Sequence, residues 1–450
     1  MYTTVNPYNQ EKISDYQYLE HTEAVNIIKE SAKTYSNWKS KSLTERLTFI
    51  DKLAKTLDLK KDALAAMATA EMGKPITQAI AELNKCKLLC EFYLQKSELF
   101  LADEKITSDG SESYATYEPL GVILGIMPWN FPYWQVFRFA IPTIIAGNTV
   151  AVKHASNVAG CAALIEELFT HAGFPEGVYK NVFISGDQVK EIINLPAVKA
   201  ISLTGSEKAG ASAASTAAAQ IKKAVLELGG SNGLIVLEDA DMEHTVKEAV
   251  TARFQNTGQS CIAAKRFFVH EKIYDTFLEK FKAALEELKI GDPTKEDTYI
   301  GPMARVDLAE EIEKQVNKSV EMGAKIVTGG TRNEAFYTPT ILTDVTPEMP
   351  VFKQEVFGPA VPVVKFSSFE EAVALSNQSE FGLGVSVFTT DIENIKSKLH
   401  LFEEGAVFIN ALVKSDPALP FGGVKRSGYG RELSEHGIKE FVNVKTVYIK

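Results

Sequence analysis

The pattern of apolar and polar positions divides the chain into a helical first part and an alternating second part. Between residues 23 and 101, apolar residues recur at steps of three and four, which is the spacing of one face of an α-helix. We therefore expect helices over 23–39, 44–73 and 77–101. Cys86 and Cys90 are four residues apart in the third helix. We interpret them as buried thiols rather than a metal pair, because no histidine or further cysteine lies near them.

From residue 121 the pattern changes to short apolar runs rich in β-branched residues, which are typical of buried strands. We expect strands within 121–129, 147–155, 180–185, 198–206 and 233–239, and helices within 159–173, 187–195 and 207–225. Such alternation predicts βαβ units in a parallel, doubly wound sheet. A second series follows residue 261, with strands within 266–270, 324–330, 361–366, 384–390 and 405–410 and helices within 273–291 and 368–377. The sequence thus predicts two α/β units.

Composition and charge exclude several classes of protein. Apolar residues make up 45 % of the 450 residues and charged residues 24 %, which is ordinary for a globular protein. The net charge of −10 disfavours nucleic acid or an anionic membrane as a partner. The N-terminus lacks the basic and apolar segments of a secretion signal, and prolines and Arg138 interrupt the most apolar stretch. With only four cysteines, we expect a cytoplasmic protein without a disulfide framework.

Polar residues stand where the predicted strands end. Asn130, Lys153, the run Thr204–Ser206 and Glu227 each follow an apolar run, and ligands of doubly wound sheets gather at that edge. The segment "TGSEKAG" lacks the GxGxxG fingerprint, but its glycine precedes a predicted helix whose N-terminus could receive a pyrophosphate. Each residue alone could be a surface charge or part of a turn. Together they indicate a nucleotide-binding α/β enzyme.

Cys261 is a candidate nucleophile in the loop "NTGQSC". The nearest histidines, His270 and His244, are nine and seventeen residues away in the chain, so the local sequence offers no base to activate the thiol. From the residues alone, an inert thiol and a thiol ionised by other groups both remain open.

Five motifs, in order and at matching spacing, resemble the aldehyde dehydrogenase superfamily: "PWNFP" (128–132), "LELGGS" (226–231), "NTGQSC" (256–261), "EVFGP" (355–359) and "PFGGVKRSGYGRE" (420–432). Within it, the chain is most similar to the short-form bacterial succinate-semialdehyde dehydrogenases, through "FRFAIP", "VKHAS", "GPMAR" and "PFGGVKRSG". The resemblance implies an α/β fold of two doubly wound domains plus a small β oligomerisation arm. Residues 1–105 and 121–228 would form the NAD(P)-binding domain, 229–430 the catalytic domain, and 106–120 with 431–450 the arm of a homodimer or homotetramer.

The resemblance also assigns catalytic roles. Cys261 would attack the aldehyde to form a thiohemiacetal, whose oxyanion the Asn130 amide and the Cys261 backbone N–H would hold. Hydride transfer to the nicotinamide would leave a thioester, and Glu227 would activate the water that hydrolyses it. Lys153 would complete the catalytic set while also holding the adenosine ribose. The family ionises its thiol through backbone dipoles, the cofactor charge and the glutamate instead of a histidine.

For the cofactor, the resemblance implies NADP or NAD and no metal. Ser156 stands where strictly NAD-using relatives carry a glutamate, so we expect NADP to be accepted; Ser156 could also merely cap a helix. The implied cofactor residues are Ile126, Met127, Pro128, Trp129, Lys153, Ser156, Gly186, Thr204, Gly205, Ser206, Leu228, Glu355 and Phe357.

For the substrate, the resemblance favours succinate semialdehyde, bound by Arg138, Trp134 and Ser415. Arg138 could instead be a structural arginine paired with an acid. Gln255 replaces an arginine that binds the carboxylate in mammalian enzymes, and no second cysteine follows Cys261 within three residues. Glutarate semialdehyde or an uncharged aliphatic aldehyde therefore stays open as the substrate. A CoA-acylating semialdehyde dehydrogenase and a non-catalytic structural relative are disfavoured, because Glu227, Cys261 and Asn130 are all present.

Overall fold

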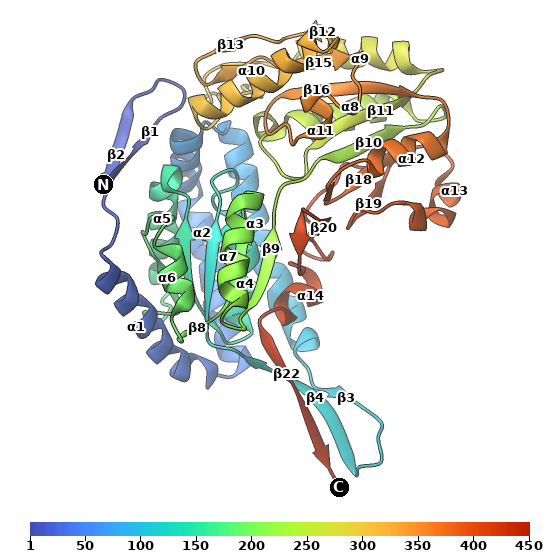
Figure 1. Ribbon diagram of the computed structural model, residues 1–450. Helices are drawn as coiled ribbons and strands as arrows, with labels where there is room; N and C mark the ends of the chain where they lie inside the picture. The colour runs from blue at the N-terminus through green and yellow to red at the C-terminus, as the bar shows by residue number, and fades with distance from the viewer.

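A computed structural model describes residues 1–450 and shows two α/β lobes with a narrow arm below them (Figure 1). The first lobe contains a six-stranded sheet in the order β21-β9-β8-β5-β6-β7, and the second a seven-stranded sheet in the order β12-β15-β16-β11-β10-β18-β19. A three-stranded sheet, β22-β4-β3, forms the arm. The prediction of two doubly wound α/β units with a β arm is confirmed.

Three long helices precede the first sheet, close to the predicted ranges. They are α1 (His21–Lys39), α2 (Leu43–Met72) and α3 (Ile76–Phe100). The prediction that the first hundred residues are helical was wrong for the beginning, where β1 (Tyr2–Val5) and β2 (Lys12–Tyr16) form an antiparallel hairpin. Its strands are too short and polar to show a clear period-two pattern.

Most elements of the first lobe lie in the predicted ranges, but helix α4 and strand β9 were not among the predicted elements. Its elements are β5 (Val122–Met127), α4 (Trp134–Ile145), β6 (Thr149–His154), the 3₁₀ turn η1 (Ser156–Val158), α5 (Ala159–His171), β7 (Tyr179–Asn181), α6 (Val189–Asn194), β8 (Val198–Thr204), α7 (Glu207–Ala218) and β9 (Lys223–Glu227). The helix expected to continue to 225 ends at Ala218, because Ile221 adopts a left-handed φ of 54° and the chain then pairs with β8.

The order of this sheet creates a switch point. β5 lies between β6 and β8, and the chain runs from β5 outward to β6 and β7 before returning to β8 and β9 on the other side. All five strands are parallel to one another. A crevice for ligands is expected outside the carboxyl ends of strands at such a point, which is where Asn130 and the run Thr204–Ser206 lie.

The second sheet contains elements that the sequence pattern predicted and others that it did not. Its elements are β10 (Asn232–Val236), α8 (Met242–Phe254), the 3₁₀ segment η2 (Gln255–Gly258), β11 (Ala264–His270), α9 (Tyr274–Glu286), α10 (Val306–Glu321), β12 (Lys325–Thr328), β13 (Arg332–Asn333), β14 (Phe336–Tyr337), β15 (Thr340–Thr343), α11 (Pro350–Lys353), β16 (Ala360–Phe366), α12 (Phe369–Asn377), β17 (Phe381–Gly382), β18 (Val385–Phe388), α13 (Ile392–Ser397), the 3₁₀ turn η3 (Leu399–Leu401) and β19 (Val407–Ile409). Helix α10 and strand β15 were not predicted, although Ala309, Ile312 and Val316 form a buried helical face.

The chain returns to the first lobe before the predicted boundary at residue 430. Strand β20 (Val424–Lys425) pairs with β17, whereas β21 (Gly428–Tyr429) already pairs with β9, and α14 (Ser434–Lys439) packs against α3 and α4. In the arm, β22 (Val442–Ile449) pairs with β4 (Glu112–Pro119), which also pairs with β3 (Glu104–Lys105). None of the helices combines the length and the apolar composition of a membrane-spanning segment.

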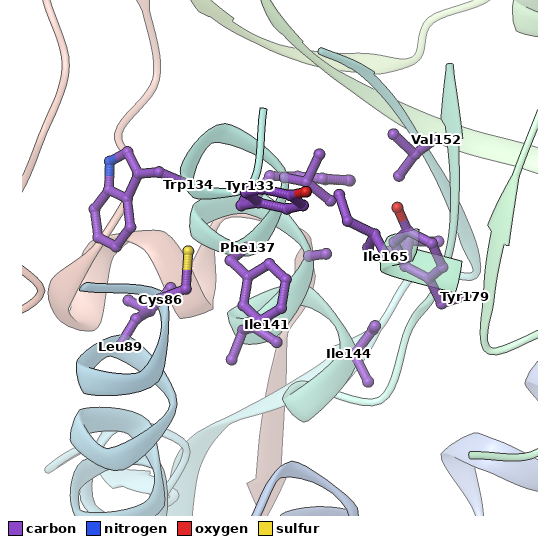
Figure 2. Close-up of a cluster of buried hydrophobic side chains, with 14 of the residues drawn as sticks. Cys86, Leu89, Tyr133, Trp134, Phe137, Ile141, Ile144, Val152, Ile165 and Tyr179 are labelled. Atoms are coloured by element: carbon purple, nitrogen blue, oxygen red, sulfur yellow. The ribbon is translucent and has the colours of Figure 1, made fainter. Parts of the chain in front are cut away.

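The largest core cluster joins the long helices to the first sheet. Figure 2 shows Cys86 and Leu89 of α3 beside Trp134, Phe137 and Ile141 of α4. The two cysteines of α3 are fully buried in this cluster, as expected for core thiols. The cluster therefore places α4, which carries two of the predicted substrate residues, firmly against α3.

A buried ion pair fixes the start of α4. Glu82 of α3 accepts hydrogen bonds of 2.8 Å from the backbone N–H groups of Tyr133 and Trp134, and it also pairs with the buried ammonium of Lys74. These contacts satisfy two N–H groups at a helix end that would otherwise lack partners.

We predict that Glu82→Ala lowers the free energy of unfolding by about 3–5 kcal/mol, because it leaves the Lys74 ammonium buried without a counter-charge. The measurement is urea denaturation followed by fluorescence. The exposed Glu98→Ala on the same helix is the control and should change stability by less than about 0.5 kcal/mol. Equal losses in both variants would contradict this role for Glu82.

Candidate active site

The loop that carries Cys261 has an unusual backbone. Asn256, Thr257 and Gly258 adopt φ values of 56°, 55° and 73° in succession, between α8 and β11. A Cβ added to Gly258 would lie 2.6 Å from the backbone oxygen of Gly358, so only glycine fits there. Left-handed backbone in non-glycine residues costs free energy and is typical of functional sites. Its persistence here requires that neighbouring groups hold the loop.

The asparagine and glutamine of the "NTGQSC" motif provide that hold. The Asn256 side-chain amide donates to the backbone oxygens of Asn130 (2.8 Å) and Gln259 (3.1 Å). The Gln259 amide donates to the Asn256 oxygen, while its own carbonyl accepts from the Ala304 N–H at 2.9 Å. The backbone N–H of Asn256 donates to Gln78 of α3 at 2.6 Å. The loop is thereby tied to both lobes.

Cys261 lies where two cavities meet. A cavity of about 260 Å³ opens on one side, and a second of about 220 Å³ opens on the other. Only Cys261 and Gln135 line both. A thiol at this junction can contact a small molecule in the first cavity while a group in the second lies against the same reacting centre.

The groups around Cys261 have opposite effects on the pKa of its thiol. Burial raises the pKa of the thiol above its ordinary value, and the positive charges of Arg138 and Lys265 lower it in part. Glu227 and Glu355 act in the raising direction. Two cations, and no imidazole, thus oppose the effect of burial, although the pKa of the thiol stays above its ordinary value.

Lys265 was not predicted from the sequence. Its ammonium is fully buried and donates to the backbone oxygens of Gly230 (2.6 Å) and Cys261 (2.9 Å) and to the Glu355 carboxylate (2.8 Å). It thus joins the nucleophile loop to a predicted cofactor residue. The signal in the sequence was that Lys265 and Arg266 directly precede the apolar run of this strand, where an unpaired charge would be costly.

Asn130 lies beside the nucleophile loop. Its side-chain amide is buried and donates to the backbone oxygen of Gln259 at 3.1 Å, two residues before Cys261. The residue lines the second cavity together with Cys261. An amide N–H in a cavity that the thiol also lines is the donor type that an oxyanion hole needs.

Glu227 ends β9 and lies outside both cavities. Both carboxyl oxygens are buried without a hydrogen-bond partner. Burial, with a contribution from Glu432, raises the pKa of Glu227 well above its ordinary value, while Arg138 and Arg431 oppose this. A carboxyl group that no hydrogen bond restrains, and whose pKa is raised, is of the type that accepts and donates protons in enzymes.

Most of the predicted cofactor residues come together at the second cavity. Eight of them line it, and they come from the ends of β5, β8 and β9 and from the loop before β16: Pro128, Trp129, Thr204, Gly205, Ser206, Leu228, Glu355 and Phe357. Ser206, rather than Gly205, caps helix α7, and its hydroxyl accepts from the Ala209 N–H. Leu308 of the unpredicted helix α10 also lines the cavity, as do Gln135 and Gly229.

The remaining predicted cofactor residues lie along the same sheet edge, outside this cavity. Ile126 and Met127 end β5, opposite Lys153 and His154 in the β6 register, and Gly186 is exposed beyond β7. Burial lowers the pKa of Lys153, which forms no ion pair. Ser156 is exposed at the start of η1, whose N-cap is Ala155, and its hydroxyl makes no capping bond. The helix-capping interpretation of Ser156 therefore does not hold.

These features fit a dinucleotide. The edge offers Lys153, which forms no ion pair, the free hydroxyl of Ser156, and the N-terminus of the twelve-residue helix α7. All three lie at the switch point of the sheet. Glycine at 229 keeps the approach open, because a Cβ there would lie 2.5 Å from the Glu355 carboxylate.

The predicted substrate residues Trp134, Arg138 and Ser415 all line the first cavity, with Gln255. Arg138 also forms the structural pair with an acid that the sequence left open: it contacts the buried Glu432 carboxylate, and its guanidinium lies 4.5 Å from the Phe421 ring centroid. Ser415 accepts hydrogen bonds from the indole N–H of Trp134 (3.0 Å) and from Lys85 (2.7 Å). Lys85, on α3, was not predicted.

Comparison with known proteins places this geometry in a family. A probable succinate-semialdehyde dehydrogenase (NADP+) of Synechocystis is 48 % identical over 99 % of both chains, and the succinate semialdehyde dehydrogenase (NAD(P)+) Sad of Escherichia coli is 43 % identical over 99 % of this chain and 97 % of its own. The crystal structure of succinic semialdehyde dehydrogenase from Streptococcus pyogenes with NADP+ superposes with a TM-score of 0.97, at 37 % identity, with full coverage of both chains. The model of the aldehyde dehydrogenase family matches residues 1–447. The chain therefore belongs to the aldehyde dehydrogenase family.

Proposed function

We propose that this protein oxidises succinate semialdehyde to succinate with NADP or NAD. The observation that carries the proposal is the position of Cys261 at the junction of the two cavities. Relatives that match along the whole chain are named for this substrate and these cofactors. The presence of Glu227 favours hydrolysis of the acyl intermediate over its transfer to CoA.

In the proposed reaction, the thiol of Cys261 first loses its proton, which the charges of Arg138 and Lys265 favour. The thiolate adds to the aldehyde carbon, and the carbonyl oxygen becomes an oxyanion next to the Asn130 amide. When bound at the second cavity, the nicotinamide supplies a hydride acceptor. Loss of hydride from the thiohemiacetal carbon leaves a thioester on Cys261.

Glu227 then completes the cycle. Its carboxylate removes a proton from water, the resulting hydroxide adds to the thioester carbonyl, and the Cys261 thiolate leaves as the acid is formed. Since Glu227 lies outside both cavities in this structure, its side chain must turn toward Cys261 for this step. The absence of hydrogen bonds to its carboxyl oxygens makes that rotation inexpensive.

Four of the predicted cofactor residues have a specific role in this proposal. Lys153 holds the adenosine ribose, Ser156 accommodates a 2′-phosphate, and Glu355, kept in place by Lys265, holds the nicotinamide ribose. Phe357 packs at the nicotinamide end, where its ring lies 5.7 Å from that of Trp129.

We also infer a homodimer or homotetramer. The arm sheet projects from the lobes (Figure 1), and its outer strand β22 leaves one edge unpaired. Exposed Val444, Tyr448 and Ile449 lie on that strand. An unpaired strand with exposed apolar side chains favours association with another subunit. The cytoplasmic location inferred from the sequence stays a prediction.

The substrate is tested by comparing kcat/KM for succinate semialdehyde with that for its neutral methyl ester, methyl 4-oxobutanoate. We expect at least a tenfold preference for the charged aldehyde, since a buried cation–carboxylate contact is worth about 2–5 kcal/mol. Glutarate semialdehyde, one methylene longer, should be oxidised less efficiently. Equal efficiency on the acid and its ester would contradict the proposed substrate.

Glu227→Gln should slow hydrolysis of the thioester more than its formation. We expect a burst of about one reduced nicotinamide per site, followed by turnover reduced by about 10²–10⁴-fold. Because the pKa of Glu227 is raised and the carboxylate is the active form, wild-type deacylation should weaken as the pH falls through that pKa. Stopped-flow absorbance measures both phases, and Cys261→Ala, which gives no burst, is the control. A burst lost in Glu227→Gln would place this residue in an earlier step.

Ser156→Glu should shift the ratio of kcat/KM values from NADP toward NAD by at least about tenfold, because a carboxylate repels the 2′-phosphate and accepts bonds from ribose hydroxyls. Ser156→Ala removes the hydroxyl without adding charge, so its shift should be smaller. The cofactor ratio is measured at saturating aldehyde. An unchanged ratio in Ser156→Glu would show that this residue does not face the 2′ position.

A further inference from the structure

Lys85 is a cation in the first cavity without a counter-charge. Its side chain extends from α3 to the cavity wall, where the ammonium donates to the Ser415 hydroxyl at 2.7 Å and lies 4.2 Å from the centroid of the Trp134 ring. No carboxylate lies within 4.0 Å of it. Burial, followed by the positive charge of Arg138, lowers the pKa of Lys85 to about 8.

The other cations in this part of the protein are already neutralised. Lys74 pairs with Glu82, Lys265 with Glu355 and Arg138 with Glu432. Lys414, at the cavity margin, is largely exposed and lies 3.5 Å from the Asp416 carboxylate. Of the three cations that line the first cavity, only Lys85 is therefore left without an acid.

The hydroxyl beside Lys85 is also available to a ligand. Ser415 Oγ accepts two hydrogen bonds, one from Lys85 and one from the Trp134 indole N–H. Its own O–H has no acceptor within the protein. A hydroxyl that accepts on its oxygen can still donate its single hydrogen. Ammonium and hydroxyl together present donors, and no acceptor, to the cavity.

Lys85 is half-buried, and a partly desolvated ammonium without a counter-ion is costly; a bound anion relieves that cost. The neighbouring groups make the geometry specific: Trp134 holds the Ser415 oxygen with its N–H and covers the Lys85 ammonium with its ring. Cys261 lines the same cavity, so an aldehyde carrying an anionic group could contact both.

We propose that Lys85 is a further determinant of selectivity for charged aldehydes: it binds the carboxylate of the aldehyde substrate, beside the hydroxyl of Ser415 that the family resemblance already assigns to the substrate. This inference rests on the proposed function and deepens it. Trp134 is a positioning residue in this arrangement, because it orients Ser415 and supports the lysine.

The test replaces Lys85 with methionine, which keeps the length of the side chain and its packing on Trp134 but removes the charge. We expect the KM for succinate semialdehyde to rise at least tenfold with little change in kcat. The kcat/KM for methyl 4-oxobutanoate should stay within about twofold. Lys85→Arg should retain part of the selectivity, and Lys96→Met, an exposed lysine on the same helix, should match wild type.

Two further measurements separate binding from a structural role. NADP titration by tryptophan fluorescence should give wild-type affinity in Lys85→Met. Ser415→Ala keeps the charge but removes the hydroxyl, so it should lower selectivity less, and it tests the site independently should Lys85→Met fold poorly.

The pH dependence gives a sharper readout. The selectivity ratio, kcat/KM for succinate semialdehyde over that for the ester, should fall as the pH rises through about 8, where Lys85 loses its proton. Cys261 and Glu227 serve both substrates and cancel from this ratio. The charged or titratable groups that influence Lys85 are Arg138 of α4, Cys86 and Glu82 of α3, and Asp416 after β19. In Lys85→Met the ratio should not vary around pH 8.

The outcomes are distinguishable. A wild-type enzyme that does not prefer succinate semialdehyde over the ester contradicts the proposed function. A selective wild-type enzyme whose Lys85→Met variant keeps that selectivity contradicts the role of Lys85 alone, as does a variant that loses efficiency equally on both substrates. The proposal is supported if Lys85→Met loses the preference for succinate semialdehyde over the ester and if the selectivity ratio of this variant does not change around pH 8.

Discussion

The positive charge of the buried Arg138 guanidinium is the interaction on which the electrostatics of the site depend. It pairs with Glu432 and lowers the pKa values of Cys261, Glu227 and Lys85, which come from three different parts of the chain. Burial opposes ionisation of the thiol and of Glu227, and Arg138 counters it in both. Because Glu432 offsets this charge, one arginine can influence several titrating groups without being an unpaired ion itself.

Hydrogen bonds at the boundary between the two lobes hold the groups around Arg138 in place. Gln78 and Glu82 of α3, in the first lobe, hold respectively the nucleophile loop and the start of α4. Lys265 of the second sheet holds the backbone oxygen of Cys261 and the Glu355 carboxylate. A loop with three successive left-handed residues keeps its conformation because both lobes hydrogen-bond to it. The thiol is thus fixed, whereas Glu227, whose proposed step follows that of Cys261, is held by no hydrogen bond.

The two cavities have different linings, which suit different ligands. The one at the switch point of the first sheet contains backbone and hydroxyl donors at strand ends, which suits a dinucleotide. The other combines aromatic walls with three cations: Arg138 pairs with Glu432, Lys414 lies beside Asp416, and Lys85 has no acid. Arg138 and Lys85 therefore need not have the same role there: the first sets the electrostatics of the reacting groups, and the second remains free for an anionic ligand.

The sequence by itself determined the alternation of strands and helices, the sheet edge where polar residues gather, and Cys261, Asn130 and Glu227 as candidates, because these are properties of local spacing and of short motifs. It did not reveal the hairpin of β1 and β2, helix α10 with Leu308, or the contacts of Lys265, Glu82 and Lys85. Helical spacing shows which face a residue occupies but not what that face meets: Lys85 and Ser415 are 330 residues apart in the chain. Whether a buried charge is paired depends on groups that only folding brings within a few ångströms, so the tertiary structure alone decided that Arg138 has its acid and that Lys85 has none.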